Sequence, residues 1–312
     1  MDQVANTILS SGRSAVELAL FILLPIMIVM LTIMHWLDDK GILNRIVILL
    51  TPILKPFGLT GLSVFALLQT TMVSFAAPIA TLAIMARNGS SDRHIAATLA
   101  MVMALAQANV VFPMAAGGLD VANTIAIALC GGFIASASAY YLFGRTLSTT
   151  NTCPDDQLLP IAKEQRNLLT TIRHAGKDAW EIAIGALPLL VVALVDVNLI
   201  RMTGAIDLLE NLTRDLLIAA GYPPQTLLLA FTKYIAGGTA MMGIAMEAVN
   251  NGALSSTSIN LIAGLLICPL DIAGLAILVS AGPRIAAVAL PAVLGALTGI
   301  VFRIICHTLL YA

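Results

Sequence analysis

Long apolar runs separated by short polar segments make up most of the chain. The runs lie at about 17–37, 60–87, 94–114, 120–144, 179–200, 223–249, 257–281 and 284–311. Each approaches or exceeds the ~18–20 residues that a helix needs to cross the apolar core of a bilayer. The alternation typical of a membrane barrel is absent. Because helices satisfy their own backbone hydrogen bonds in lipid, the pattern predicts an all-α polytopic membrane protein.

Two long runs carry turn-forming residues near their middle. In the segments 60–88 and 223–251, each half of the run has about 13 residues and as a helix would rise about 20 Å, enough to reach the middle of the membrane. Glycine permits a tight reversal and proline ends a helix, so these residues predict a re-entrant hairpin in each segment. The predicted tips are Ser74-Phe75-Ala76-Ala77-Pro78 and Ala236-Gly237-Gly238-Thr239. One straight helix with a kink is the alternative.

Other segments indicate helices that lie in the membrane interface or that are broken. The amphipathic segments 41–58 and 204–221 are typical of interfacial helices. Polar residues and prolines interrupt two further runs and predict broken helices, which membranes tolerate around a polar cavity. These residues are Gln107, Asn109 and Pro113 in one run, and Pro269 and Asp271 in the other. A face of small residues for close helix packing comprises Gly131, Gly132, Ala135, Ser136 and Ala139.

A constant spacing divides the chain into two related halves. Several prolines and glycines recur 163 residues later, namely Pro25, Gly41, Gly58 and Gly89 as Pro188, Gly204, Gly221 and Gly252. We therefore expect a first repeat at 1–144, a cytoplasmic polar linker at 145–178 and a second repeat at 179–312. Internal repeats with broken helices are typical of secondary transporters.

The positive charges discriminate between two topologies. If every run crosses once, the Lys and Arg residues outside the membrane divide nine to six. If both hairpins re-enter, they divide eleven to four, with Arg13, Arg201, Arg214 and Arg303 on the poorer side. The positive-inside rule favours the second topology. It predicts inverted repeats in a bacterial cytoplasmic membrane, with both termini outside.

Composition agrees with this fold class and narrows the partners. Apolar residues make up 59% of the chain and charged residues 11%, with a mean hydropathy of +0.96, whereas soluble domains carry roughly 25% charged residues. A net charge of −1 argues against a nucleic-acid partner. The four cysteines are scattered without a CxxC pair or a histidine cluster, so we expect no metal site and no cofactor.

Lys233 is the most informative residue, because it lies about halfway along a predicted hairpin. An ionisable side chain at bilayer depth is costly and indicates function, unless it reaches a headgroup. The predicted substrate site joins three groups of residues: Thr232, Lys233, Gly237, Gly238 and Thr239; Gln69, Thr70 and Ser74; and Gln107, Asn109 and Asp271. Lys233 either binds an anionic group or pairs with Asp271, and a purely structural Lys–Asp bridge is the alternative.

The chain resembles the nucleoside recognition (gate) domain family, the group that contains spore maturation proteins A and B. The resemblance rests on the recurring proline and glycine pattern of both halves and on FTKYIAGGTAM at 231–241. More remotely, the order of elements is similar to concentrative nucleoside transporters and to the membrane domain of ferrous-iron transporters. The resemblance implies inverted repeats that hold a substrate between hairpin tips and broken helices, with coupling to Na⁺ or H⁺.

These features predict a secondary transporter of a small polar solute, with anionic and nucleoside-like solutes as candidates. No GxxxxGK[ST] motif supplies nucleotide energy, and no HExxH, GxSxG or paired-aspartate motif indicates an enzyme. A non-transporting membrane sensor or assembly factor that acts with a partner protein is the alternative. A homo-oligomer and a membrane partner subunit both remain open.

Overall fold

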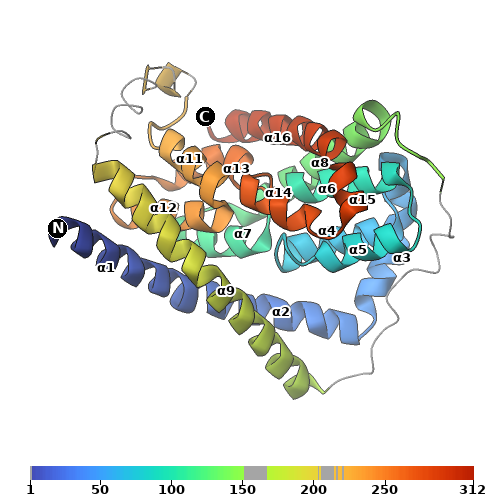
Figure 1. The fold of residues 1–312 in the computed structure, drawn as a ribbon, viewed down its shortest axis with the longest axis horizontal. Coiled ribbons are helices and arrows are strands. Elements are labelled where there is room, and N and C mark those ends of the chain that lie inside the picture. Colours follow the sequence, from blue (N-terminus) through green and yellow to red (C-terminus); the bar gives the residue numbers. More distant parts are fainter. Residues whose placement is uncertain (1, 151–166, 203, 205–213, 216, 220) are drawn as a thin grey trace.

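The computed structural model describes residues 2–150, 167–202, 204, 214–215, 217–219 and 221–312. Within these residues every regular element is a helix (Figure 1). Among the described residues, four helices are long and apolar enough to cross a membrane, or up to five if one bent pair counts as a single span. Large apolar side chains such as Phe21, Leu290 and Leu309 are mostly exposed, as lipid-facing residues are. The chain is an all-α polytopic membrane protein.

The first half begins with a long helix and continues through shorter ones. Its α-helices are α1 (Asp2–Glu17), α2 (Leu24–Asp39), α3 (Ile42–Leu54), α4 (Gly61–Met72), α5 (Ile79–Arg87), α6 (Asp92–Ala104), α7 (Ala108–Met114) and α8 (Val121–Ser138). A π-helical turn, Leu18–Leu23, joins α1 to α2 without interrupting the helix. The pair α3 and α4 bends by 105°.

The second half also begins with a long helix and continues through shorter ones. Its helices are α9 (Leu168–Met202), α11 (Thr226–Ala236), α12 (Gly238–Asn250), α13 (Ser256–Leu266), α14 (Ile272–Val279), α15 (Pro283–Ala287) and α16 (Ala289–Tyr311). Most of the predicted interfacial helix at 204–221 lies outside the described residues, whereas its counterpart at 41–58 is largely helix α3. Both predicted broken helices are broken, between α6 and α7 and between α13 and α14.

The glycines behind the predicted spacing have matching backbone conformations. Gly58 and Gly221 have φ angles of 77° and 80°, in the left-handed region that favours glycine. The other two pairs behave alike, with φ of 66° and 74° at Gly41 and Gly204, and 79° and 70° at Gly89 and Gly252. The two glycines of each pair thus share a positive φ.

The long helices of the two halves pack side by side in opposite directions. Asn198 donates to Ser11 over 3.0 Å, and His35 lies 3.0 Å from the carboxylate of Asp178. The start of the α1–α2 helix thus lies beside the end of α9, and its end lies near the start of α9 (Figure 1). The two helices are antiparallel.

Helix α9 begins earlier than the sequence predicts. It starts at Leu168, inside the segment 145–178 that the sequence assigns to a polar linker, while residues 151–166 lie outside the described part. Its first turns pack against α2, where Thr171 donates to Asp39 over 2.6 Å. Small buried residues four apart form the packed face: Thr171, Ala175, Ala179 and Ala183. This long-range packing extends the helix beyond its apolar run.

Helices α8 and α16 cross closely, as the predicted small-residue face requires. A Cβ on Gly299 would overlap the carbonyl of Gly131, and a Cβ on Gly295 would lie 2.7 Å from the carbonyl of Ala135. Residues later in α16 thus contact residues earlier in α8, so this pair is also antiparallel. The predicted packing role of Gly131 and Ala135 is confirmed.

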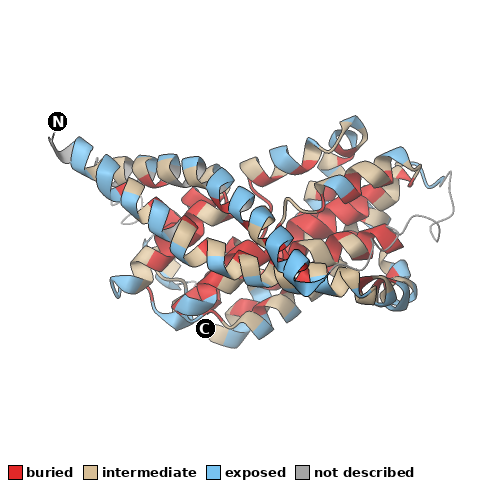
Figure 2. Ribbon diagram, turned by 90° about the horizontal axis from the view of Figure 1, so that it is seen from below, coloured by how far each residue is buried: buried red, intermediate tan, exposed pale blue. Residues whose placement is uncertain are grey.

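Helix α6 lies in the interior of the protein. All its side chains from Ile95 to Ala104 are buried, and Figure 2 shows buried residues gathered inside a periphery of exposed ones. The helix is therefore shielded from lipid by the protein around it.

Polar contacts between distant segments gather at two places in the fold. In one, Arg284 donates to Asp92 over 3.1 Å, and Arg93 donates to the carbonyl of Gly144 over 3.1 Å. These bonds bring together the start of α6, the end of the first half and the start of α15.

In the other place, segments from both halves also meet. Asn260 donates to the carbonyl of Gly118 over 3.0 Å, and the hydroxyls of Tyr222 and Thr308 lie 2.7 Å apart. The start of α8, the starts of α11 and α13 and the end of α16 thus lie near one another.

Candidate functional site

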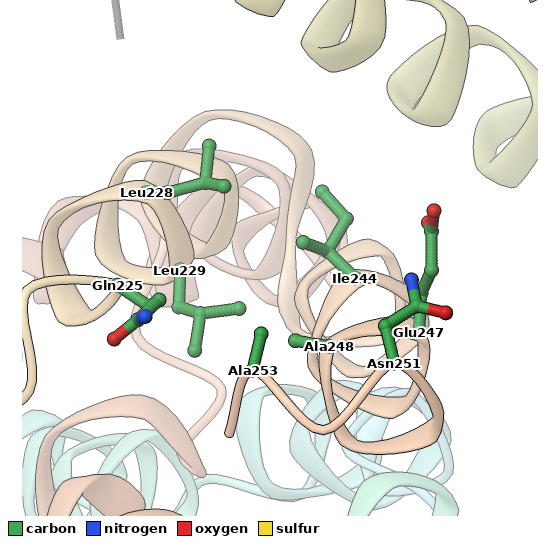
Figure 3. A pocket seen from close by; sticks show the side chains of 8 residues that line it. All are labelled: Gln225, Leu228, Leu229, Ile244, Glu247, Ala248, Asn251 and Ala253. Carbon is green, nitrogen blue, oxygen red and sulfur yellow. The ribbon is translucent and has the colours of Figure 1, made fainter. Parts of the chain in front are cut away.

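The second predicted hairpin reverses at its predicted tip. Helix α11 ends at Ala236 and α12 begins at Gly238, with Gly237 between them at φ 90° and ψ 169°. Residues other than glycine rarely adopt this backbone conformation. The two helices pack against each other, and Gln225 at the start of the hairpin and Asn251 at its end line opposite sides of one crevice (Figure 3). The chain therefore doubles back at Gly237.

Lys233 lies one turn before this tip and is completely buried. Its ammonium donates to the Asp271 carboxylate oxygen Oδ2 and to the carbonyl oxygen of Leu270, the latter over 3.4 Å. The other carboxylate oxygen of Asp271 accepts a 2.6 Å bond from the backbone N–H of Gly274. Asp271 thus caps α14 and pairs with Lys233 at the same time.

The ion pair excludes one of the readings of Lys233, a lysine that reaches a headgroup. The side chains of Lys233 and Asp271 are 0% and 4% exposed, so the lysine does not reach a headgroup. A buried cation is costly unless it is paired and hydrogen-bonded. The pair supplies that compensation and leaves this part of the site with no net charge.

The break of the first half meets the tip of the second hairpin. Asn109, in α7, donates to the hydroxyl of Thr239 over 3.4 Å. A Cβ on Gly238 would overlap the side-chain nitrogen of Gln107, so the absence of a side chain there lets the amide approach the tip. Residues from both halves are therefore in contact at this point.

Two acceptor atoms at this contact have no hydrogen-bond partner among the described residues. They are the side-chain oxygens of Gln107 and Asn109, whose residues are 1% and 5% exposed. A buried acceptor without a partner costs about 1–3 kcal/mol. Such groups are retained where a ligand or a water supplies the missing donor.

The first hairpin also folds back, but its polar groups bond within the hairpin. Thr81 of α5 donates to the side-chain oxygen of Gln69 of α4 over 2.7 Å, and Thr70 donates to the carbonyl of Ala66 over 2.9 Å. Ser74 lies buried at the tip. In the described part of the chain, no hydrogen bond joins Gln69, Thr70 or Ser74 to the second hairpin.

Thr232 behaves like Thr70. Its hydroxyl donates to the carbonyl of Leu228, one turn earlier in α11, over 2.9 Å. The structure thus brings together Lys233, Gly237, Gly238, Thr239, Gln107, Asn109 and Asp271. Gln69, Thr70, Ser74 and Thr232 lie in the two hairpins, and among the described residues no side-chain hydrogen bond joins them to that group.

Arg303 is a buried residue, so its assignment to the external charges in the topology with two hairpins is wrong. It is 0% exposed and lies inside the protein. Its guanidinium donates to the carbonyls of Ala104 and Ile267, each over 2.6 Å. These carbonyls end the first segments of the two broken helices, where the helix dipole is negative. One guanidinium therefore binds the carbonyls of both breaks.

Glycines make room for this arginine. A Cβ on Gly131 would lie 2.6 Å from the Cγ of Arg303, and a Cβ on Gly264 would lie 2.6 Å from the carbonyl oxygen of Arg303. A signal for the residue exists in the sequence, because Arg303 is an ionisable residue inside the apolar run 284–311. The rule that identifies Lys233 applies equally to Arg303.

Two crevices adjoin the open end of the second hairpin, away from its tip. One, of about 90 Å³, separates α11 from α12 and is lined by Leu228, Leu229, Ile244 and Ala248 among others (Figure 3). The other, of about 220 Å³, lies between α12 and the α1 and α9 helices. Glu247 and Asn251 border both crevices.

Neither a protein-family model nor a curated protein sequence matches the chain. Solved structures do. A structure described as CNTnw in an inward-facing, substrate-bound state has a TM-score of 0.67 at 16% identity, covering 98% of this chain and 83% of that one. CNTnw with two substitutions in an outward-facing state has a TM-score of 0.66 at 17% identity, covering 99% and 85%.

A third structure, substituted CNTnw in the intermediate 1 state, has a TM-score of 0.63 at 16% identity, covering 91% of this chain and 75% of that one. CNTnw is a concentrative nucleoside transporter. The similarity extends over nearly the whole chain, and at this identity it shows a common fold. This chain has the fold of a concentrative nucleoside transporter.

Proposed function

We propose that the chain is a secondary transporter of a small polar solute that works by alternating access, and not an enzyme. The observation that carries this proposal is the meeting of a glycine hairpin tip with two broken helices around buried polar groups. Secondary transporters usually bind their substrates where membrane helices are broken. The similar structures, described as inward-facing, outward-facing and intermediate states of one transporter, support the same function.

The proposed topology is a pair of inverted repeats with two re-entrant hairpins. The antiparallel packing of the α1–α2 helix with α9, and of α8 with α16, supports inversion, since each pair contains corresponding helices. The bond between Arg284 and Asp92 adds support. If every apolar run crossed once, an odd number of crossings would place these two residues on opposite sides. We propose a bacterial cytoplasmic membrane with both termini outside.

The proposed substrate site lies between the second hairpin tip and the breaks. Gln107 and Asn109 offer buried oxygens without donors, and the α12 N-terminus and Thr239 lie beside them. Because Asp271 already neutralises Lys233, an anion would have to displace a buried carboxylate from the ammonium. The site therefore favours a neutral solute that presents N–H or O–H donors, a class that includes nucleoside-like molecules.

We propose that Gln69, Thr70 and Ser74 of the first hairpin, and Thr232 of the second, complete the site in another state of the cycle. Their hydroxyl and amide groups now bond within the hairpins or lie buried at the tip. A shift of either hairpin relative to the broken helices would free them for a solute. Such a movement of a hairpin against a fixed site is how alternating access exposes each side in turn.

A screen of purified protein tests the proposal. Solutes that bind the native state raise its unfolding temperature, so nucleosides, carboxylates, lipid phosphates and cations are compared, and the best solute is then tested for flux into liposomes. Flux that Lys233→Ala abolishes in a folded protein supports transport. Capture of a partner protein without flux of any solute would favour the sensor or assembly factor instead, and would contradict the proposal.

A further inference from the structure

Side-chain cations occupy the oxygen-lined ends of both broken helices. The ammonium of Lys233 contacts the carboxylate of Asp271 and the carbonyl of Leu270 in the second break. The guanidinium of Arg303 contacts the carbonyls of Ala104 and Ile267, and more weakly that of Ala263 at 3.4 Å. Both side chains are 0% exposed.

These oxygen atoms are the kind of ligand that hard metal cations prefer. Carboxylate and backbone carbonyl oxygens bind such ions, and broken membrane helices commonly bind Na⁺ with the carbonyls that their breaks set free. The partial negative charge at each helix C-terminus adds to the attraction. A break of this kind is therefore suited to a cation, and in this chain the cation is part of a side chain.

We propose that Lys233 is a tethered cation filling a monovalent-cation site formed by Asp271 and Leu270, so that the second break needs no free Na⁺ or K⁺. Arg303 likewise supplies a side-chain cation to the carbonyls of Ala104 and Ile267. The inference deepens the proposed function by naming the ion requirement of its site. It assigns any coupling to Na⁺ to another part of the chain.

The tether also links the hairpin to the broken helix. Lys233 extends from α11, and Asp271 is the residue that caps α14. A free ion would leave when these helices separate, whereas the ammonium moves with the hairpin. The site is thus filled only while the second hairpin lies against α14, which makes the contact a latch on this hairpin.

The test removes the tether and asks whether a free ion replaces it. Lys233→Ala keeps the Asp271 carboxylate and leaves space beside it. Its unfolding temperature in detergent is compared in NaCl, KCl and N-methylglucamine chloride at equal ionic strength. We expect saturable stabilisation of Lys233→Ala by Na⁺ or K⁺ over N-methylglucamine, and no such difference for the wild type. Propylammonium chloride, which matches the deleted atoms, should also stabilise the variant.

Two further variants show whether the cation effect depends on the Lys233–Asp271 site. In Lys233→Ala/Asp271→Asn the carboxylate is absent, so the stabilisation by metal cations should disappear. Lys177→Ala removes an exposed lysine that lies 4.0 Å from Glu181, and it should respond to the salts as the wild type does. Lack of any cation effect on Lys233→Ala, or an effect that survives Asp271→Asn, would overturn the proposal.

The wild type tests the inference even if Lys233→Ala fails to fold. A Na⁺- or K⁺-specific rise in its unfolding temperature that Asp271→Asn removes would show a free ion at this break, and would overturn the proposal. An unchanged unfolding temperature supports it. Because this readout needs no flux, it is independent of whether the chain transports a solute, and failure of transport would not be mistaken for failure of the tethered cation.

Discussion

The guanidinium of Arg303 donates to the carbonyl oxygen of Ala104 over 2.6 Å, which joins the last helix of the chain to the end of α6. The same guanidinium bonds to Ile267 in the second break. Both broken helices therefore end on one side chain. Because Arg303 binds both, it fixes the two breaks relative to each other. The Lys233–Asp271 pair and the hairpin tip lie at these breaks.

Replacing Arg303 tests this role. Arg303→Met leaves the buried carbonyls of Ala104 and Ile267 without their donors, so we expect a loss of about 3 kcal/mol or more in unfolding free energy. Chemical denaturation in detergent measures it. Arg173→Met, which changes an exposed arginine of α9, is the matched control and should cost less than about 0.5 kcal/mol. Equal stability of the two variants would contradict the role of Arg303.

The close packing of α13 against α16 at Arg303 depends on Gly264. Gly264→Ala would place a Cβ 2.6 Å from the backbone carbonyl oxygen of Arg303, and α13 and α16 would have to separate. We expect a loss of about 1–3 kcal/mol, typical of overpacking. Gly185→Ala in α9 is the control, because a Cβ there meets nothing within 4 Å. Its expected effect is neutral or slightly stabilising, and the opposite order of the two variants would refute the packing account.

The buried pair predicts strong coupling between two substitutions. Lys233→Met or Asp271→Asn alone leaves a buried group uncompensated, so each should cost about 3–5 kcal/mol. The double variant should recover much of the loss, because neither charge then remains. A double-mutant cycle on unfolding free energies measures this coupling. Simple addition of the two losses would show that the residues do not compensate each other.

The inverted topology predicts the side from which added cysteines react. After Cys130, Cys153, Cys268 and Cys306 are replaced by serine, exposed positions can be labelled one at a time. Ser148→Cys and Ser280→Cys should react with a membrane-impermeant reagent only from the cytoplasm, and Thr257→Cys only from outside. Reaction of Ser148→Cys and Ser280→Cys from opposite sides would favour a chain in which every run crosses once.

Asp120 provides a pH-dependent contribution outside the membrane-spanning segments. The backbone N–H of Asn123 donates to its carboxylate and holds the pKa of Asp120 below its usual value of 3.8, partly opposed by burial. A lowered folded-state pKa stabilises the protein above pH 3.8, and this stabilisation is lost as the pH falls. The wild type should therefore unfold at a higher temperature than Asp120→Asn at pH 7, and the difference should shrink below pH 3.8. A difference independent of pH would contradict this.

Local signals explain which parts of the fold could be predicted. Gly237 and Pro78 mark reversals by their own backbone preferences, and Asp271 marks a helix start by its side chain. Lys233 is conspicuous because charge is costly in lipid. Each of these properties is visible in a short stretch of sequence.

Other parts depend on contacts between distant residues. The partners of Arg303 are 199 and 36 positions away, and the residues next to Arg303 in the sequence do not predict them. The early start of α9 likewise depends on its packing against α2. The approach of Gln107 to Gly238 joins the two halves of the chain and follows from their relative placement. Such relations appear only in three dimensions.

The most direct test of the proposed site is solute uptake by liposomes that contain Gln107→Ala, compared with the wild type and with Asn44→Ala. Asn44 lies on α3, away from the tip and the breaks. If a solute donor bonds to the buried oxygen of Gln107, its loss should lower uptake by about tenfold or more at subsaturating solute. Asn44→Ala should transport as the wild type does. Undiminished uptake by folded Gln107→Ala would contradict a substrate site at this contact.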